Sequence, residues 1–381
     1  MDMRYPIRRF TLKGYKSIRC LEDFELSAVN VLIGANGCGK SNFVGFFYLL
    51  RELVERRLEL AVNKAGGADT QLYLGPKVTK KVEARVGFGP VAYEFTLVPT
   101  VDRRLVFGDE RILYDGSQGT HPVNRSLALG TGHGESRLTA EHEESRLTTD
   151  LDARTGHVSE DIYDAVLSST LYHIHDTSET AAMRRSCWIG DYERLRPDAG
   201  NIAPFLNFLR DNDARTYRLI VDTVRLVAPF FKDFAFRPTK SKDDEVLQLG
   251  WIQEGSDYPF APSQLSDGTL RFIALATALL QPNPPATVLI DEPELGLHPL
   301  AVELLGNLIL RAQGQTQLIV STQSARLLNC FEPKHIVVVD RHDGESTFKR
   351  LDEAALATWL EDYSLGELWQ KNIFGGGPVH E

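Results

Sequence analysis

The residues whose types and spacing most directly suggest chemistry lie in the segment 34–41, which reads Gly-Ala-Asn-Gly-Cys-Gly-Lys-Ser. A glycine followed by four residues and Gly-Lys-Ser is the P-loop pattern, whose glycines let backbone N–H groups converge on one concavity. We expect Lys40 to reach the β- and γ-phosphates of a nucleoside triphosphate and Ser41 to ligate Mg²⁺. The residues predicted to bind the nucleotide are Gly34, Ala35, Asn36, Gly37, Cys38, Gly39, Lys40, Ser41 and Asn42.

A second candidate group is a pair of carboxylates, Asp291 and Glu292, at the end of the apolar run 287–290. A strand buried on both faces carries few polar residues, so acids at its C-terminal end indicate a site. Asp291 is expected to hold Mg²⁺ directly or through water, and Glu292 to orient and deprotonate an attacking water. A kinase acting on a small molecule does not need such a glutamate, so the pair favours hydrolysis.

A third group, Ser266, Asp267 and Gly268, precedes an apolar helix expected over residues 269–280. Taken alone, Ser266 or Asp267 is a helix N-cap that leaves free N–H groups at the helix start. Beside the other two motifs, the segment 263–269 resembles the signature motif of ABC-type ATPases, Leu-Ser-Gly-Gly-Gln. All three residues are therefore predicted to contact the nucleotide.

The three groups occur in the order typical of ABC-type ATPases, and the segment 291–299, Asp-Glu-Pro-Glu-Leu-Gly-Leu-His-Pro, resembles the RecF/SMC-like and OLD-like branch. The segments 12–18, 172–178 and 365–369 are similar to a group of small bacterial ATPases. The resemblance covers roughly residues 8–110 and 165–375. It implies two ATP molecules held head to tail between two protomers, with Ser266 and Gly268 facing the γ-phosphate bound to the opposite chain.

The chain departs from the family pattern at several of these positions. Asp267 replaces a signature glycine, and its carboxylate should weaken closure on a triphosphate unless it is turned away or paired. Gln323 stands at the switch-histidine position and would sense the γ-phosphate by hydrogen bonding, without a titratable ring. His298 occupies the D-loop aspartate position, as is usual in this branch. His175 is either the counterpart of the Q-loop glutamine or a core histidine.

The predicted catalytic residues are thus Lys40, Glu292 and Gln323, and the predicted metal ligands are Ser41 and Asp291. The predicted cofactors are ATP and Mg²⁺. Adenine is favoured because the guanine-specificity motif Asn-Lys-x-Asp does not occur in the sequence.

The elements that must position these residues follow an α/β pattern. The apolar run 29–33 predicts a buried strand, and apolar residues at helical spacing follow from Ser41 to about Val62. Alternating apolar residues over 81–98 and 105–113 predict an antiparallel β-meander. We therefore expect a P-loop NTPase of the ABC-ATPase head type, with a mixed central sheet, the meander and a helical lobe.

The sequence predicts four consecutive segments. Residues 115–162 contain no aromatic residue and are polar, which predicts a solvated, partly mobile insertion, with a partner-docking role as the alternative. The predicted segments are an N-terminal ATPase lobe with P-loop and β-meander (1–114), the insertion (115–162), a helical lobe (163–262) and a C-terminal ATPase lobe (263–381).

Composition limits the classes of function. Forty-two Lys+Arg against 52 Asp+Glu give a net charge of −10, so DNA contact needs a local basic patch and rests mainly on the resemblance. No apolar run is long enough to cross a membrane. The four cysteines, whose spacing fits no metal site, favour a reduced, cytoplasmic setting.

These observations leave three hypotheses for function. The first is an ATPase that dimerises around ATP, as a homodimer or higher oligomer, and does DNA-associated work in anti-phage defence or DNA repair. The segment after Gln323 is shorter than the nuclease domain of OLD-like proteins, so a separate nuclease or toxin subunit is expected as effector. The second is a slowly hydrolysing, ATP-bound scaffold, suggested by Asp267 and Gln323. The third is the nucleotide-binding subunit of a transporter, which the missing Q-loop glutamine and the D-loop sequence disfavour.

Overall fold

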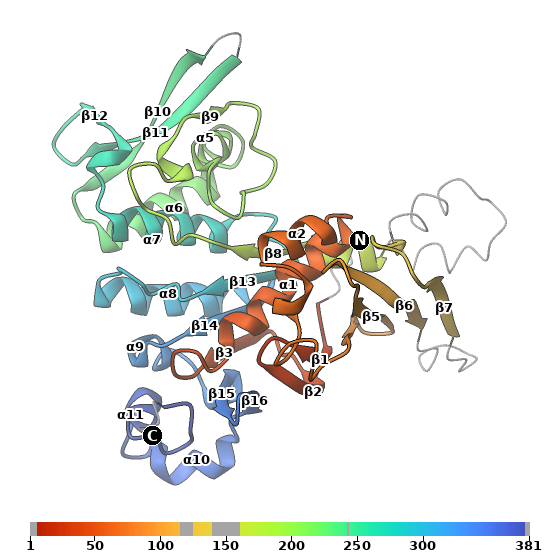
Figure 1. Cartoon of the computed structure of the whole chain (residues 1–381). Helices are drawn as coiled ribbons and strands as arrows, with labels where there is room; N and C mark the ends of the chain where they lie inside the picture. The colour runs from red at the N-terminus through yellow and green to blue at the C-terminus, as the bar shows by residue number, and fades with distance from the viewer. Residues whose placement is uncertain (1–5, 115–124, 139–160, 242–243, 378–381) are drawn as a thin grey trace, which may run out of the picture.

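The computed structural model describes residues 6–114, 125–138, 161–241 and 244–377. A mixed sheet in the order β16-β15-β3-β14-β13-β8 forms its centre (Figure 1). All neighbouring strands in it run parallel except β15 and β16. The strands are β3 (Val29–Ile33), β8 (Ser169–Tyr172), β13 (Thr287–Asp291), β14 (Gln317–Thr322), β15 (Ile336–His342) and β16 (Glu345–Arg350).

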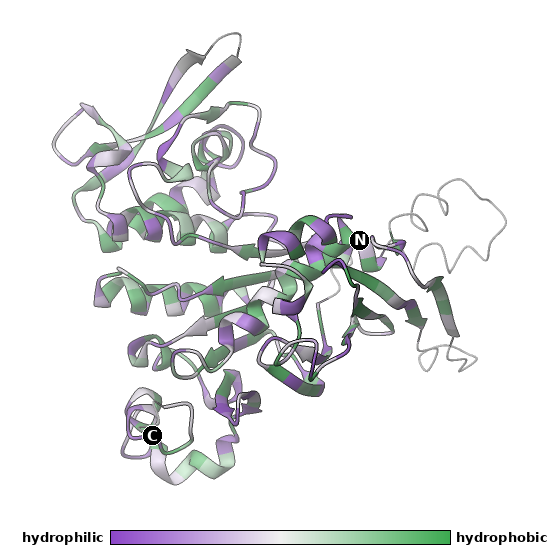
Figure 2. Ribbon diagram, in the orientation of Figure 1, coloured by the Kyte–Doolittle hydropathy of each residue, from purple (hydrophilic) through white to green (hydrophobic). Residues whose placement is uncertain are grey.

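The central strands are apolar on both faces because each face is covered by another layer. In β13, Leu289 packs with the core around α1 (Lys40–Val54), while Val288 and Ile290 pack with the core around α7 (Asp267–Leu280). Figure 2 shows these strands as mostly hydrophobic. The two faces of the central sheet are therefore covered by two different layers, which gives a three-layer arrangement.

The layer beyond α1 is an antiparallel sheet in the order β2-β1-β4-β5-β6-β7. Phe10 of β1 lies against the Phe43, Phe46 and Phe47 rings of α1, with ring centroids 5.2–5.4 Å apart. The strands of this sheet are β1 (Arg9–Tyr15), β2 (Ile18–Glu25), β4 (Val82–Gly87), β5 (Val91–Pro99), β6 (Leu105–Tyr114) and β7 (Arg125–Gly130). The predicted meander is present as β4, β5 and β6, which pair in sequence order.

Part of the predicted polar insertion belongs to this sheet. Strand β7 pairs with β6, and the Glu135 carboxylate accepts hydrogen bonds from the Leu58 and Glu59 N–H groups at the start of α2 (Leu58–Lys64). Leu127 and Leu129, with Ala128 between them, carried a period-2 signal that the low aromatic content obscured. The rest of the insertion, 115–124 and 139–160, lies outside the described residues.

The segment predicted as a helical lobe contains the expected helices and also a small antiparallel sheet. Its helices are α5 (Ile202–Asn212) and α6 (Ala214–Val227). The strands, which sequence analysis missed, are β9 (Cys187–Trp188), β10 (Phe231–Ser241), β11 (Asp244–Gln253) and β12 (Pro259–Phe260). Buried Leu247, Leu249 and Trp251 alternate along β11, which is a strand signal.

Helices α8 (Pro299–Ala312) and α9 (Ala325–Leu328) lie on the face of the central sheet opposite α1 (Figure 1). Helices α10 (Glu353–Leu360) and α11 (Leu365–Gln370) form the C-terminal part of the described chain. Across the described ranges, no helix has the length and apolar character needed to cross a membrane.

Removing the aromatic contact between α1 and the antiparallel sheet should destabilise the whole chain. Phe46 is fully buried. We expect Phe46→Ala to lower the free energy of unfolding by about 3–5 kcal/mol in urea denaturation, because its neighbours cannot refill the space. The control Leu60→Ala removes an exposed side chain and should change stability by about 0.5 kcal/mol or less. Equal losses from the two variants would contradict this packing.

Candidate functional site

The predicted P-loop connects β3 to the start of α1, in a curl that only glycine permits. Gly39 has a φ of 119°, and a Cβ there would lie 2.1 Å from Ser346 Oγ and 2.9 Å from Ser17 Oγ. A Cβ on Gly34 would lie 2.2 Å from the Val339 carbonyl oxygen. Close packing against β15, β16 and the β1–β2 turn therefore shapes the loop, and these glycines have a specific steric role.

Polar side chains from distant segments hold the loop in place. Asn42 Nδ2 donates to Ser17 Oγ at 2.7 Å. Ser346 Oγ donates to the Cys38 carbonyl and lies within hydrogen-bond distance of Ser17 Oγ, at 2.7 Å. Arg341 Nη1 donates to the Gly37 carbonyl at 3.0 Å. Ser17, Ser346 and Arg341 were missed by sequence reasoning, since no local pattern marks them as supports of a loop so distant in sequence.

The Lys40 ammonium lies inside the curl of the P-loop. Nζ donates to the carbonyl oxygens of Gly34 at 2.7 Å and Ala35 at 3.1 Å, and the residue is only 4% exposed. These carbonyls satisfy a buried cation that would otherwise be costly. A phosphate oxygen is a stronger, charged acceptor that can replace them. Burial raises the pKa of the neighbouring Cys38 thiol, which favours its neutral form.

The predicted acidic pair lies at the C-terminal end of β13. Asp291 accepts a hydrogen bond from the Ser321 hydroxyl of the adjacent strand β14. Glu292 follows with a left-handed φ of 42°, and its N–H donates to the Ser321 carbonyl at 2.9 Å. Non-glycine residues rarely adopt this conformation, and where they do it is often at functional sites.

Glu292 and Gln323, the predicted catalytic carboxylate and the predicted γ-phosphate sensor, contact each other directly. Gln323 Nε2 donates to Glu292 Oε1. The contact forms because β13 and β14 pair in parallel, so their carboxyl ends lie side by side. The contact restrains the Glu292 carboxylate through one of its two oxygens.

Glu294, which sequence reasoning overlooked, supports the same loop. Its Oε1 accepts from Thr322 Oγ1 at 2.6 Å and from the Gln323 N–H at 2.9 Å. Burial raises the pKa of this carboxyl, and within the described structure Oε2 is buried without a hydrogen-bond partner. Its place two residues after Glu292 was the one available signal. Glu294 therefore holds the backbone of Gln323 in place.

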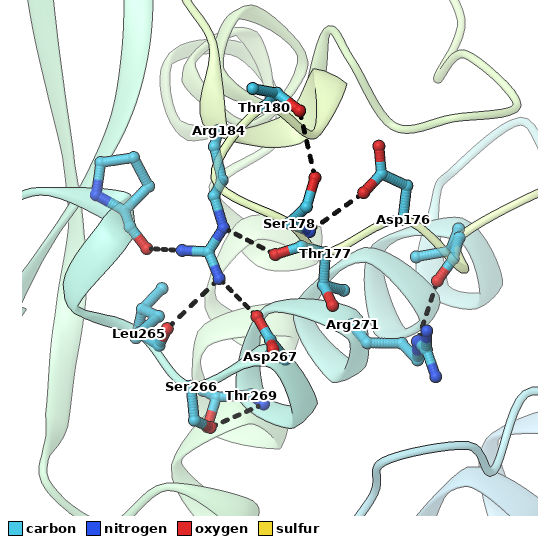
Figure 3. A network of polar contacts seen from close by, with 12 residues as sticks. Asp176, Thr177, Ser178, Thr180, Arg184, Leu265, Ser266, Asp267, Thr269 and Arg271 are labelled. Atoms are coloured by element: carbon cyan, nitrogen blue, oxygen red, sulfur yellow. Dashed lines mark hydrogen bonds and ion pairs between the residues drawn. The ribbon is translucent and has the colours of Figure 1, made fainter.

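The predicted signature residues lie at the start of α7 (Figure 3). Ser266 Oγ accepts from the Thr269 N–H at 3.1 Å and is the N-cap. Asp267 is paired, because its Oδ1 accepts from Arg184 Nη2 at 2.8 Å. A Cβ on Gly268 would lie 2.4 Å from the Gly296 carbonyl oxygen, so only glycine lets the helix start approach the loop after Glu292.

Arg271, one turn into α7, joins this helix to two neighbouring loops. It donates to the Ile174 carbonyl at 2.9 Å, to the His175 carbonyl at 2.6 Å and to the Leu295 carbonyl. The His175 side chain is exposed, so the alternative of a core histidine is wrong. His298 is the N-cap of α8, where its Nδ1 accepts from the Leu300 N–H at 3.3 Å.

The parallel sheet thus brings most of the predicted residues to one edge. The P-loop follows β3, Glu292 follows β13, and Gln323 follows β14, which lies between them. Among the described residues, no hydrogen bond joins the signature segment to the P-loop, and no cluster of three His, Cys, Asp or Glu could hold a metal. Ser41 is exposed at the start of α1, and the Asp291 side chain accepts a hydrogen bond from Ser321. An oxygen set of Ser41, Asp291 and phosphate fits Mg²⁺.

Substitution of the tightly packed P-loop glycine should abolish nucleotide binding. We expect Gly39→Ala to displace Ser346 and Ser17 and to weaken ATP binding at least tenfold in isothermal titration calorimetry, since its Cβ collides with both hydroxyls. The control Gly45→Ala lies on the same helix with open space around its Cβ, and should bind ATP normally while gaining up to about 1 kcal/mol of stability. Normal binding by Gly39→Ala would refute the steric argument.

The raised pKa of Glu294 predicts a pH-dependent cost. Between the unfolded and folded pKa values the native state binds more protons, so the stability contributed by this group is complete at low pH and falls as pH rises. The free energy of unfolding of the parent, measured relative to Glu294→Gln, should therefore decrease as the pH rises above about 4.3, the ordinary pKa of a glutamate. The exposed Glu361→Gln serves as the control. An increase relative to Glu294→Gln would contradict the assigned burial.

Comparison with solved structures finds a similar fold. Solved structures that match over most of both chains include an SMC head bound to the C-winged helix domain of ScpA. It has 16% identity, coverage of 92% of this chain and 99% of that chain, and a TM-score of 0.55. An SMC head with an extended coiled coil bound to ScpA from Pyrococcus furiosus gives 16% identity, 94% and 99% coverage and a TM-score of 0.48. The SMC head from Thermotoga maritima has 15% identity, coverage of 91% of this chain and 99% of that chain, and a TM-score of 0.40.

The comparisons also decide the predicted fold and family. The SMC-head likeness confirms the P-loop NTPase fold of ABC-ATPase head type. No curated protein matches the chain. A family model described as "AAA domain, putative AbiEii toxin, Type IV TA system" matches residues 29–329, which is more than half of the chain and includes all three predicted motifs. The chain belongs to this family of ATPase domains, as the predicted resemblance implied.

Proposed function

We propose that this chain hydrolyses ATP to ADP and phosphate, and that two protomers assemble head to tail around two ATP molecules. The observation that carries the proposal is the meeting of Glu292 and Gln323 at the sheet edge that also bears the P-loop. A carboxylate oriented by a hydrogen bond next to a triphosphate site can accept a proton from water, and an adjacent amide can report the γ-phosphate.

The residues divide the work as follows. The backbone of the P-loop and Lys40 bind the phosphates, and Glu292 orients the attacking water. Ser41 and Asp291 would hold Mg²⁺, which neutralises charge on the phosphates when bound. Ser266 is exposed at the start of α7 and can offer its hydroxyl and the helix N–H groups to a phosphate on a second chain.

The proposed biological role is regulation of a separate effector. The family description, which names a toxin and a toxin–antitoxin system, supports a role in defence with a nuclease or toxin partner. The SMC head in the solved complex is bound to a winged-helix domain, which supports the idea that this fold docks protein partners. DNA is proposed as a further ligand that modulates ATP turnover.

A slow, ATP-bound scaffold is the second candidate function. It is favoured by the hydrogen bond from Gln323 to Glu292, because an amide that occupies one carboxylate oxygen restrains the proposed base. Single-turnover release of phosphate separates the two candidates, since the scaffold would retain its ATP while an ATPase releases phosphate.

Blocking hydrolysis should trap the proposed dimer. We expect Glu292→Gln to lower phosphate release by about 10²–10⁴-fold. In light scattering on a sizing column, its mass should double with ATP and Mg²⁺. The same Glu292→Gln protein carrying Lys40→Ala or Ser266→Arg should not double, because the first loses phosphate contacts and the second fills the signature surface. A Glu292→Gln protein that binds ATP and stays monomeric would refute the composite site.

A further inference from the structure

Arg184 is a buried cation whose side chain is used entirely to hold other segments (Figure 3). It lies in a short 3₁₀ helix, Ala182–Arg184, and its side chain is 7% exposed. Nε donates to the Thr177 carbonyl at 3.0 Å, and Nη1 donates to the Pro262 carbonyl. Nη2 donates to Asp267 Oδ1 at 2.8 Å and, at 3.4 Å, to the Leu265 carbonyl.

The Asp267 carboxylate is the one charge-balancing partner recorded for this cation in the described chain. An arginine does not lose its proton in a protein, so a buried guanidinium needs an anion or several carbonyl oxygens around it. The Asp267 side chain is itself 69% exposed, and it turns back from the first residue of α7 toward Arg184. The Asp267 carboxylate is therefore paired with a buried guanidinium, while most of its side chain is exposed to solvent.

The same contacts connect the signature segment to the catalytic edge. Thr177 belongs to the stretch that leaves β8, the strand next to β13 in the central sheet. Arg271 binds the carbonyls of Ile174 and His175 in that stretch, and Arg184 binds the carbonyl of Thr177. Gln248 of β11 donates to the Arg184 carbonyl at 3.0 Å, which connects the small antiparallel sheet to Arg184.

We propose that Arg184 is a positioning residue that neutralises Asp267, so that the signature segment can close on the triphosphate of a second protomer. This inference rests on the proposed head-to-tail function. A carboxylate at the start of α7 repels a γ-phosphate, and the repulsion is large where water is excluded. A guanidinium fixed at 2.8 Å from that carboxylate cancels the repulsion, whereas a glycine at this position would not have needed it.

The test is a charge-rescue series on the full-length chain in the Glu292→Gln background. The measured quantity is the protomer concentration at half-assembly with ATP and Mg²⁺, from light scattering. We expect Arg184→Met to raise it at least tenfold, and Asp267→Asn added to Arg184→Met to restore it to within about threefold of the parent. ATP affinity below the assembly concentration should stay unchanged in Arg184→Met, because a separate protomer binds ATP through its P-loop. Arg185→Met, which removes the adjacent exposed arginine, is the matched control and should assemble normally.

The outcomes separate charge compensation from simple support. If Arg184 only held the Thr177 and Pro262 carbonyls, Asp267→Asn would not rescue Arg184→Met, and the inference would be overturned. If Arg184→Met fails to fold, as judged by thermal unfolding, Asp267→Asn alone decides: it should assemble at least as tightly as the parent, and a tenfold loss overturns the inference. If the Glu292→Gln parent does not assemble with ATP, the proposed function is wrong and the inference falls with it.

Discussion

Parallel hydrogen bonding between β3, β14 and β13 is the constraint on which the whole site depends. Parallel strands have their carboxyl ends at one edge, so residues that follow three separate strands become neighbours. The P-loop, Glu292 and Gln323 are brought together in this way. The layers on both faces of the sheet exist to keep these apolar strands dry, and the aromatic cluster of α1 anchors the P-loop helix against one of them.

The residues of the site engage one another where a nucleotide would engage them. Lys40 donates to the carbonyls of its own loop, and Gln323 donates to Glu292. Each contact satisfies a group that is partly or fully buried, which lowers the cost of the site before a ligand arrives. Binding of the proposed triphosphate would then exchange internal partners for external ones, without first exposing an unpaired charge.

The fold class and the core of the site were predictable from sequence because their determinants are local. The P-loop spacing, the acidic strand end and Ser266 each lie within a few consecutive residues. Glu294, Ser346 and Arg184 could not be predicted, since their roles arise from contacts with segments far away in the chain. The sheet of β9–β12 was missed for another reason: β9 and β12 are two residues long, and the buried alternation in β11 covers Leu247, Leu249 and Trp251, which is a short signal.

The close approach of Gly268 to the Gly296 carbonyl has a consequence for communication between the two nucleotide sites of a head-to-tail pair. Because Gly268 has no side chain, the backbone at the start of α7 directly contacts the loop that follows Glu292. Any shift of that loop when the protomer's own nucleotide changes must therefore displace the segment presented to its partner. Occupancy of one site would be transmitted to the other through backbone contact alone. The nucleotide states of the two sites in such a pair would therefore be coupled and not independent.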